Sequence, residues 1–447
     1  MSAVLSSPFV TSLAGLSARA PKRPPIAPLA EVVGAGERVP LSSGDVVRYA
    51  NLDYAASAPA LADVARAVQR SLGQYASVHR GAGHLSQVTT ARYEAARETV
   101  REFVRGRVDD AVVFTRGTTD AINLAAHITC GDVVVLDIEH HANLLPWSAR
   151  ERTGSSRLRV VRAAPTIEDT LAALETELAS SPAALLAVTA ASNVTGEVLP
   201  VGRLAAVAHR HGARILVDAA QLVAHRPVSM VTHGVDYLVF SGHKLYAPFG
   251  AGVLVGRSDW LDAAEPYLAG GGASAAVTVD EATQSADVTW HRGAARHEAG
   301  SPNVLGALSI AAACESLTAL GFDAIGLHET ALLARLDRGL DSVDGVEPLR
   351  VFDDSTERVG IAGFVVDGRA PREVAEFLSN RAGIGVRDGK FCAHPLLRRL
   401  GFPDGAVRAS FGLGTGSDDI DRLVDALRGL ALRDARSFVA GSSGTEG

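Results

Sequence analysis

The sequence predicts an α/β fold with two lobes, a large one built on a mostly parallel sheet and a smaller one at the C-terminal end. Short apolar, β-branched runs alternate with longer segments of helical period, which is the pattern of helices packed on a parallel sheet. The 447 residues exceed the length of about 250 to 300 at which a single core usually stops growing. A second, shorter alternating series follows residue 304. We therefore expect two domains.

The large lobe is predicted from seven apolar, β-branched segments. These candidate strands are residues 111–115, 133–138, 158–163, 184–190, 214–219, 237–241 and 252–256. Helical segments fall between or before them, at 61–74, 90–105, 118–128, 166–179 and 201–211. Pro200 and Gly212 mark the start and the end of the last of these helices.

The small lobe follows a stretch rich in Gly, Ala and Thr at 270–299, which we interpret as an ordered functional loop or a crossover between lobes. After a helix at 304–320, the sequence predicts two strands and two helices, at 361–366, 371–382, 406–411 and 418–430. The expected domains are therefore 46–300, the large domain, and 301–435, the small domain. Residues 1–45 are expected to be a loosely ordered arm, and 436–447 a flexible tail.

The composition excludes several classes of protein. A net charge of -7 and a pI near 6.1 argue against a general nucleic-acid binder. No uninterrupted apolar run of about 18 residues is present, so we expect no membrane-spanning helix. The N-terminal region lacks the basic start of a secretory signal. Three unclustered cysteines fit a reducing compartment, which predicts a cytoplasmic protein.

Lysine usage gives the first indication of chemistry. Of the 43 basic residues, only Lys22, Lys244 and Lys390 are lysines. Lys244 directly follows an apolar strand and precedes a Gly-rich turn. Arginine cannot replace a lysine that forms an imine, because the guanidinium group stays protonated. Lys244 is therefore a candidate nucleophile, and a surface lysine without function is the alternative.

Asp218 lies at the end of the 214–219 strand, where ligands bind in open α/β sheets. A lysine together with a buried carboxylate is what pyridoxal 5'-phosphate (PLP) requires, since the aldehyde binds the lysine and the pyridine nitrogen must stay protonated. Asp218 would supply the negative charge for that nitrogen. A helix N-cap is the competing interpretation of the same residue.

A phosphate also needs a binding site, and the segment FTRGTTDAIN places Thr118 and Thr119 at a helix start, where free N–H groups favour an anion. Neither a dinucleotide G-x-G-x-x-G motif nor a Walker motif is present.

His140 and His141 end the next strand, and one of them can stack on a flat ring. No further ligands at zinc spacing accompany them, so we expect no metal. A core or surface histidine remains the alternative.

Two more residues of unusual context lie in the C-terminal third. Cys392 stands near Lys390 and Arg387, which could hold its thiol as the nucleophilic thiolate. An inert packing cysteine is the alternative, as we interpret Cys130 and Cys314. Arg408 lies in an apolar strand, where it could bind a substrate carboxylate or form a structural ion pair. Asn193, after the 184–190 strand, is either a turn residue or a cofactor contact.

Taken together, these segments resemble the class V aminotransferase family of fold type I PLP enzymes, most closely its cysteine desulfurase and selenocysteine lyase branch. The similar segments appear in family order from about Tyr49 to Leu430: NLDYAASAP (51–59), SVHRGAGHLS (77–86), TRGTTDAIN (115–123), EHHANLLPW (139–147), SNVTGEV (192–198), VDAAQ (217–221), SGHK (241–244), EAGSPN (298–303), VRDGKFCAHPL (386–396) and RASF (408–411).

The resemblance implies a role for each candidate residue. Lys244 would bind the PLP aldehyde, Asp218 would pair with the ring nitrogen, His140 would stack on the ring, and Gln221 and Asn193 would lie near the ring hydroxyl. The phosphate would be held by Thr118, Thr119, Ser241 and His243, with Ser301 reaching it from the second subunit of a homodimer. Arg408 and Arg387 would bind the substrate carboxylate, and Asn193 would also contact the substrate. Cys392 would take the sulfur of L-cysteine as a persulfide, releasing L-alanine, for delivery to a protein acceptor.

This chain departs from the family pattern near the substrate. Lys390 and Phe391 occupy places where desulfurases of this branch commonly have histidines, and His84 is shifted by one position within its motif. Both changes bear on the substrate and the sulfur acceptor more than on the cofactor. The alternatives are a selenocysteine lyase, another C–S lyase or an aminotransferase of a specialised pathway. A non-catalytic sulfur-relay or interaction protein is a distant one.

Overall fold

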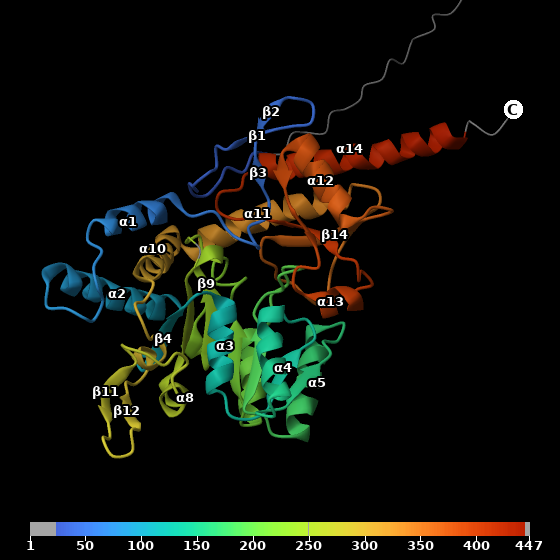
Figure 1. The fold of residues 1–447 in the computed structure, drawn as a ribbon. Helices are drawn as coiled ribbons and strands as arrows, with labels where there is room; N and C mark the ends of the chain where they lie inside the picture. The colour runs from blue at the N-terminus through green and yellow to red at the C-terminus, as the bar shows by residue number, and fades with distance from the viewer. Residues whose placement is uncertain (1–23, 249, 443–447) are drawn as a thin grey trace, which may run out of the picture.

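The computed structural model describes residues 24–248 and 250–442. Its centre is a seven-stranded sheet in the order β4-β10-β9-β8-β7-β5-β6 (Figure 1). Neighbouring strands from β9 through β6 pair in parallel, and β10 pairs antiparallel with both β9 and β4. The prediction of a mostly parallel seven-stranded sheet is therefore confirmed. The strands are β4 (Asp110–Thr115), β5 (Val133–Leu136), β6 (Leu158–Val161), β7 (Leu185–Thr189), β8 (Arg214–Asp218), β9 (Tyr237–Ser241) and β10 (Gly252–Arg257).

Helices cover both faces of this sheet, because its strands alternate apolar side chains between the two faces. In β5, Val133 and Val135 pack in one apolar cluster with helix α3, whereas Val134 and Leu136 pack in another with helix α5. Such burial on both faces is typical of parallel sheets. The large-lobe helices are α3 (Thr118–Ile128), α4 (Leu145–Arg152), α5 (Ile167–Ser180), α6 (Val201–Arg210), α7 (Met230–His233) and α8 (Ser258–Ala263).

The small lobe contains a four-stranded antiparallel sheet in the order β13-β14-β17-β16. Its strands are β13 (Val346–Pro348), β14 (Ile361–Val366), β16 (Arg387–Gly389) and β17 (Ala406–Ser410). Helices α11 (Phe322–Leu340), α12 (Pro371–Ala382) and α14 (Ser417–Ser442) pack with this sheet, and the short α13 (His394–Arg399) follows the Cys392 loop.

The N-terminal segment is part of the small lobe. Strand β3 (Ala50–Asn51) pairs in parallel with β15 (Ile384–Gly385), and Ala50 and Leu52 are buried in the small-lobe core. Strands β1 (Arg38–Pro40) and β2 (Val46–Arg48) form a hairpin beside it. Residues 24–45 thus differ from the expected loose arm, because residues 38–40 pair in β1, Val32 bridges Leu61, and the Leu29 and Ala30 amides donate to the Leu413 carbonyl. Residues 1–23 lie outside the described residues. In the same way, α14 runs through Ser442 into the expected tail, and 443–447 lie outside the described residues.

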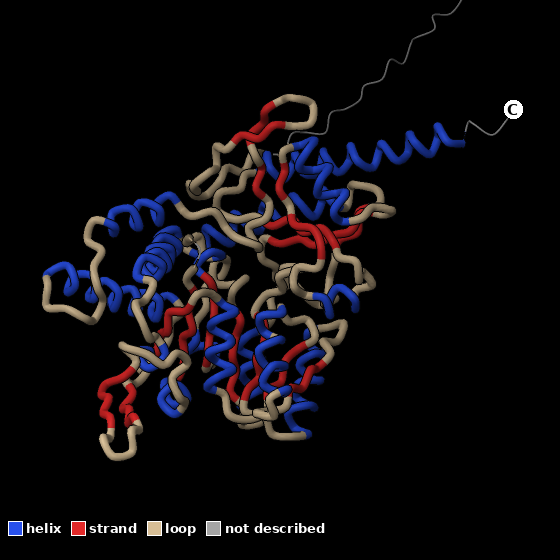
Figure 2. The backbone as a smooth tube through the Cα atoms, viewed as in Figure 1, coloured by secondary structure: helices blue, strands red, loops and turns tan. Residues whose placement is uncertain are grey.

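The boundary between the lobes also lies later than residue 301. Helix α10 (Val304–Leu320) packs against α1 (Ala62–Leu72) and α2 (His84–Phe103), and Ile310 and Leu317 belong to the large-lobe core. The change of lobe occurs within α11, whose Ile325 is in the large core and Leu332 in the small one. The segment 270–299 forms a hairpin of β11 (Ser274–Val279) and β12 (Ala286–Trp290), which projects from the large lobe (Figure 2), followed by α9 (Ala294–His297).

Within residues 24–248 and 250–442, no single helix is both long enough and apolar enough to cross a bilayer. Helices α10 and α11 meet those two criteria only jointly, as a pair bent by 81°. Most of α10 is buried in the protein, which is the position of an ordinary core helix.

Candidate active site

A cavity of about 470 Å³ lies at the carboxyl ends of the parallel strands, facing the small lobe. Strands β5, β7, β8 and β9 are consecutive neighbours in the sheet, so the segments that follow them meet at one edge. The cavity is lined by all of the predicted site residues except Ser301: Lys244, Asp218, Gln221, His140, Asn193, Thr118, Thr119, Ser241, His243, Cys392, Arg387 and Arg408. The structure therefore brings together residues that are spread over nearly 300 positions of the chain.

Lys244 and Asp218 are the buried charged pair of this cavity. Lys244 ends a short turn (η2, Gly242–Lys244) that directly follows β9, and Asp218 ends the neighbouring strand β8. Burial lowers the pKa of Lys244 to about 8, and the charge of Asp218 opposes that shift. Burial also raises the pKa of Asp218, whose Oδ1 accepts a hydrogen bond from the Ala220 amide, 3.0 Å away. A lysine with a lowered pKa is a competent nucleophile near neutral pH.

His140 presents a neutral ring to the cavity. Its Nδ1 accepts a hydrogen bond from the Ala142 amide at 3.0 Å, which places the proton of the neutral ring on Nε2. Burial lowers the pKa of His140 to about 4, and the positive charge of Lys244 acts in the same direction. A neutral imidazole can stack on a flat aromatic ligand without placing a second charge beside Lys244.

The N-terminus of α3 provides the anion-binding part of the cavity. The Thr118 amide donates to Ser241 Oγ at 2.7 Å, and the two hydroxyl groups lie 2.6 Å apart. This approach requires glycine at 252, because a Cβ there would lie 2.4 Å from the Gly117 Cα. The helix N-terminus, the hydroxyl groups of Thr118, Thr119 and Ser241, and the His243 ring line one end of the cavity.

The loop that carries Cys392 is held against the large lobe by two hydrogen bonds. The side-chain amide of Asn193 donates to the Phe391 carbonyl at 2.8 Å, and the His141 amide donates to the Cys392 carbonyl at 2.8 Å. Phe391 and Cys392 both have positive φ angles, 50° and 53°, which is uncommon for residues other than glycine. The thiol-bearing residue remains exposed at the cavity. Such consecutive strained residues persist where the surrounding structure fixes them, as at ligand sites.

Arg408 is almost fully buried, 3% exposed, at the small-lobe wall of the cavity. Its guanidinium donates to the Asn193 carbonyl at 2.9 Å and to Asp53 Oδ1 at 3.1 Å, and it lies over the Phe391 ring at 5.1 Å. The structural ion pair that the sequence left open is thus present. Its Nε, however, has no hydrogen-bond partner among the described residues, although that atom is buried. A buried unpaired donor is costly, so a ligand acceptor would satisfy it.

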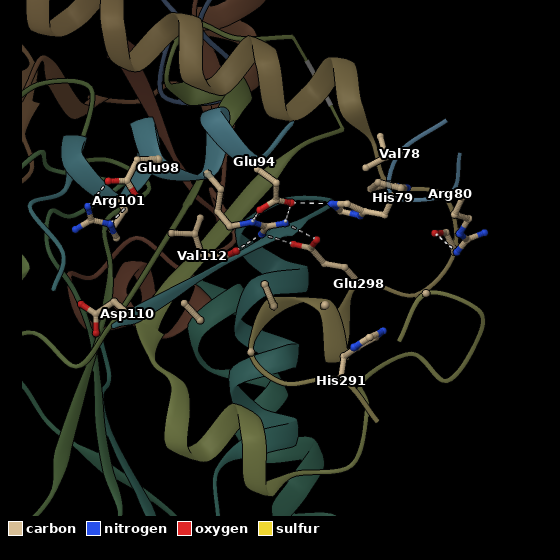
Figure 3. A pocket seen from close by; sticks show the side chains of 18 of the residues that line it. Val78, His79, Arg80, Glu94, Glu98, Arg101, Asp110, Val112, His291 and Glu298 are labelled. Carbon is tan, nitrogen blue, oxygen red and sulfur yellow. Dashed lines mark hydrogen bonds and ion pairs between the residues drawn. The ribbon is translucent and has the colours of Figure 1, made fainter. Parts of the chain in front are cut away.

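A larger cavity of about 780 Å³ lies elsewhere in the large lobe, against α2 and the start of β4 (Figure 3). In Figure 3, His79 and Glu94 point toward each other, and their side chains bond at 2.9 Å. Arg97 donates to Glu298 at 2.9 Å. Several charged groups of this larger cavity pair with one another, Arg97 with Glu94 and Glu298 and Arg101 with Glu98. Ser301 lies between Gly300 and Pro302, which line this larger cavity, and in this single chain it does not line the 470 Å³ cavity with the other predicted site residues.

Three further residues belong to the site but were not singled out from the sequence. Asp53 binds Arg408, and His394 lines the cavity with its ring edge-to-face against His141, 4.5 Å between centroids. Glu139, which precedes His140, is buried and accepts from the Asn143 side chain at 2.7 Å and from the Thr189 amide at 3.0 Å. Asp53, Glu139 and His394 all lie within the quoted motifs, so their positions were visible although their contacts were not.

Residues 50–423, which are most of the chain, match the protein family described as "Aminotransferase class-V". The chain belongs to the class V aminotransferase family. It is 40% identical to a cysteine desulfurase of Dickeya dadantii (strain 3937) over 392 residues, which are 85% of this chain and 91% of that protein. It is 39% identical to a cysteine desulfurase of Klebsiella pneumoniae (strain 342) over 363 residues, 79% of this chain and 86% of that one.

Solved structures agree with this membership of the class V aminotransferase family. The apo structure of the cysteine desulfurase from Thermococcus onnurineus NA1 matches with a TM-score of 0.78 at 31% identity, covering 86% of this chain and 94% of that one. The cysteine desulfurase CsdA (S-sulfonic acid) from Escherichia coli matches with a TM-score of 0.75 at 32% identity, covering 86% and 95%. The fold type I architecture predicted from the sequence is thereby confirmed.

As a member of the class V aminotransferase family, the protein uses PLP, and the residues of the cavity fit that cofactor. The buried Asp218 carboxylate matches a protonated ring nitrogen, because burial of a carboxylate without such a partner is unfavourable. Lys244 would hold the aldehyde, the neutral His140 ring would cover the pyridine ring, and the α3 N-terminus with Thr118, Thr119 and Ser241 would hold the phosphate.

Proposed function

We propose that this member of the class V aminotransferase family is a PLP-dependent cysteine desulfurase. It converts L-cysteine to L-alanine and transfers the sulfur to Cys392. The observation that carries the proposal is the position of Cys392, whose loop is docked at the same cavity as Lys244 and Arg408. The similarity to cysteine desulfurases at 39 to 40% identity supports it.

Each residue of the cavity has a task that follows from its surroundings. PLP bound there supplies the electron-withdrawing ring that makes the α-carbon of an attached amino acid acidic. Arg408 lines the cavity and binds the substrate α-carboxylate, which orients the Cα–H bond. Lys244, with a pKa lowered to about 8, accepts the proton from the α-carbon and can return it. Asp218, which is 4% exposed, would pair with the protonated ring nitrogen of the bound PLP.

Cys392 performs the sulfur transfer. Its thiolate attacks the sulfur of the substrate, an S–S bond forms, and the C–S bond breaks with its electron pair moving to the β-carbon. A proton on that carbon then completes L-alanine. Both sulfur atoms end in a persulfide on Cys392, and the balance is one thiol plus cysteine giving one persulfide plus alanine. No external oxidant is required. Because Cys392 is exposed, a thiol of an acceptor protein can reach the persulfide.

The test is cysteine turnover by the purified, PLP-loaded protein, with alanine and protein-bound persulfide measured in the same samples. Cys392→Ala should abolish both products while the cofactor absorbance remains. Cys130→Ala is the matched control, since Cys130 is also an exposed free thiol but lies away from the cavity, and it should behave like the wild type. Alanine formation by Cys392→Ala would contradict the proposal. Pyruvate with ammonia, or a keto acid, would indicate a C–S lyase or an aminotransferase instead.

We further propose that the protein is a homodimer acting in a reducing compartment such as the cytoplasm, with a protein as sulfur acceptor. The location of Ser301 away from its own chain's cavity supports a role in the cavity of a second subunit. A catalytic thiol that must stay reduced, together with two other free cysteines, supports the reducing compartment.

A further inference from the structure

The turn at residues 192–198 follows β7 and packs closely against a segment of the small lobe. That segment is 349–360, which connects β13 to β14. The Val359 amide donates to the Gly196 carbonyl at 2.8 Å. Gly196 has a φ angle of 78°, and a Cβ at this position would lie 2.7 Å from the Ile361 carbonyl oxygen. Only glycine therefore allows this close approach of the two segments.

Glu197 joins the same two segments through its carboxylate, which is fully buried. Its Oε1 accepts a hydrogen bond from the Phe352 amide at 2.9 Å. Its Oε2 accepts from the Val351 amide at 2.9 Å and from the Thr195 hydroxyl at 2.6 Å. Two of the three donors belong to the connecting segment and one to the turn itself, so the carboxylate links the turn to the small lobe.

Hydrogen bonds, and not an ion pair, hold this carboxylate within the described part of the chain. Arg358 pairs with Glu197 through a backbone bridge, but its guanidinium binds Asp337 at 2.9 Å and the carbonyls of Thr195 and Ile361. A buried carboxylate without a paired cation depends on its hydrogen bonds. Removal of one acceptor oxygen leaves a buried donor unsatisfied, so these contacts are costly to lose.

The other side of the turn contacts the candidate active site through Asn193. The Asn193 side chain donates to the Phe391 carbonyl at 2.8 Å, and its own carbonyl accepts from Arg408 at 2.9 Å. The Ser192 amide donates to the Glu197 carbonyl at 2.9 Å, which closes the turn between the two sets of contacts. Because the turn is short and closed, a displacement at Glu197 also displaces Asn193.

We propose that Glu197 is a positioning residue, which fixes the 192–198 turn against the small lobe and thereby holds Asn193 where it binds the Cys392 loop. The proposal rests on the proposed function in taking Cys392 as the residue that receives the sulfur. Glu197 does not line the cavity, and it acts through Asn193.

The first experiment measures persulfide formation on Cys392 in a single turnover of the PLP-loaded protein with L-cysteine. Glu197→Gln keeps the size of the side chain but turns an amide group toward hydrogen-bond donors, so one of the three bonds is lost. The rate should fall by about 3- to 10-fold, the effect of losing one buried hydrogen bond, while the content of bound PLP stays normal.

A double variant tests whether the effect passes through Asn193. The rate of Asn193→Ala with Glu197→Gln should lie within about 2-fold of the rate of Asn193→Ala alone, because residues that act through one contact are not additive. If Glu197→Gln does not fold, Thr195→Val replaces it. That variant removes one of the three donors and should show the same lack of additivity with Asn193→Ala.

Asp236→Asn is the matched structural control. Asp236 is also a buried carboxylate, which accepts from the Ile215 amide at 3.0 Å and bonds to His209 at 2.8 Å, and it does not line the cavity. In urea unfolding this variant should be destabilised, as Glu197→Gln is. Its rate of persulfide formation should equal that of the wild type.

Hydrogen exchange of the PLP-loaded protein gives a second readout that needs no turnover. The His141 amide donates to the Cys392 carbonyl, so its exchange reports whether the Cys392 loop is docked. Exchange in the peptides that contain His141 and Cys392 should be faster in Glu197→Gln and in Asn193→Ala than in the wild type. It should be unchanged in Asp236→Asn.

Wild-type exchange at His141 in Glu197→Gln overturns the proposal, and so does an effect on persulfide formation that multiplies with that of Asn193→Ala. Equal slowing by Asp236→Asn also overturns it, because the effect would then come from a general loss of stability. A wild-type protein that forms neither persulfide nor alanine would contradict the proposed function instead. The exchange comparison would still decide whether Glu197 holds the Cys392 loop.

Discussion

The side chain of Asn193 donates to the backbone carbonyl of Phe391 across a distance of 2.8 Å, and it thereby ties the large lobe to the loop that carries Cys392. Asn193 follows β7, at the edge of the sheet where PLP binds, while Phe391 immediately precedes Cys392 in the small lobe. The Asn193 carbonyl also accepts from Arg408. One residue therefore connects the Cys392 loop, Arg408 and the end of β7 at the cavity.

We expect Asn193→Ala to slow persulfide formation on Cys392 by about 3- to 10-fold, the effect of losing one buried hydrogen bond of about 1 kcal/mol. Single-turnover reaction with cysteine, with the persulfide quantified, measures this rate. PLP affinity should change less, because Lys244, Asp218 and the α3 N-terminus remain. A large loss of PLP affinity with a normal persulfide rate would show instead that Asn193 acts mainly on the cofactor ring.

We expect the rate at which Lys244 of the PLP-free protein reacts with a small amine-reactive reagent to have its midpoint near pH 8. The reason is that burial lowers the pKa of Lys244 from 10.5 to about 8. Reactivity should rise as pH increases through 8, since only the neutral amine is nucleophilic. Mass spectrometry of peptides labelled at successive pH values gives the profile. In Asp218→Asn the midpoint should fall further, because the Asp218 charge raises the pKa of Lys244. A midpoint near 10.5 would contradict the burial of this amine.

We expect Glu139 to make the PLP-free protein less stable as pH rises from about 5 to 8. Burial raises its pKa from 4.5 to about 8, so over this range the folded state holds a proton that the unfolded state has released, and the free energy of unfolding falls as pH rises. Glu139→Gln mimics the protonated side chain and removes this dependence. Relative to the wild type, the variant should therefore gain about 1 to 3 kcal/mol between pH 5 and pH 8.

Urea unfolding at pH 5, 6.5 and 8 measures this difference directly. The exposed Glu98→Gln, which removes a carboxylate from the surface of α2, is a suitable control and should show no such gain. If the difference between Glu139→Gln and the wild type stays constant with pH, Glu139 is ionised in the folded protein and the expectation is wrong.

We expect two inactive variants, Lys244→Ala and Ser301→Asp, to regain activity when they are mixed and allowed to exchange subunits. In a homodimer whose Ser301 serves the other subunit, each mixed dimer contains one cavity with both residues intact, which is about a quarter of all cavities after random exchange. Cysteine turnover before and after exchange measures the recovery. Absence of recovery in a protein that light scattering shows to be dimeric would place Ser301 in a different role.

Much of this fold follows from local sequence, because the strands of a buried parallel sheet are continuous apolar runs with clear ends. All seven large-lobe strands lie within two residues of their expected positions. Helix α2, in contrast, begins at His84 rather than at residue 90. Its first turns contain Ser86 and Thr89, whose buried hydroxyl groups bond to the backbone carbonyls of Ser77 and Gln74. Because these hydroxyl groups are buried only through tertiary hydrogen bonds, the sequence itself shows a polar stretch that resembles a loop.

The site was predictable where one residue type has one chemical use, as with Lys244 in a chain that otherwise relies on arginine. Contacts between segments that are distant in the sequence could not be predicted. Asp53 and Arg408 are 355 positions apart, and their contact depends on β3 joining the small lobe. The expected boundary at residue 301 differed for a related reason, since an apolar helix such as α10 does not reveal which of two cores it joins.

The pairing of β3 with β15 also sets an order of events during synthesis. Ala50 emerges from the ribosome more than 300 residues before its partner Ile384, which at about 5 to 20 residues per second corresponds to roughly 15 to 70 s. Throughout that interval the strand edge has no native partner, and Asp53 lacks its partner Arg408. The small lobe, and with it one wall of the candidate active-site cavity, is therefore completed only after both β3 and β15 have been made.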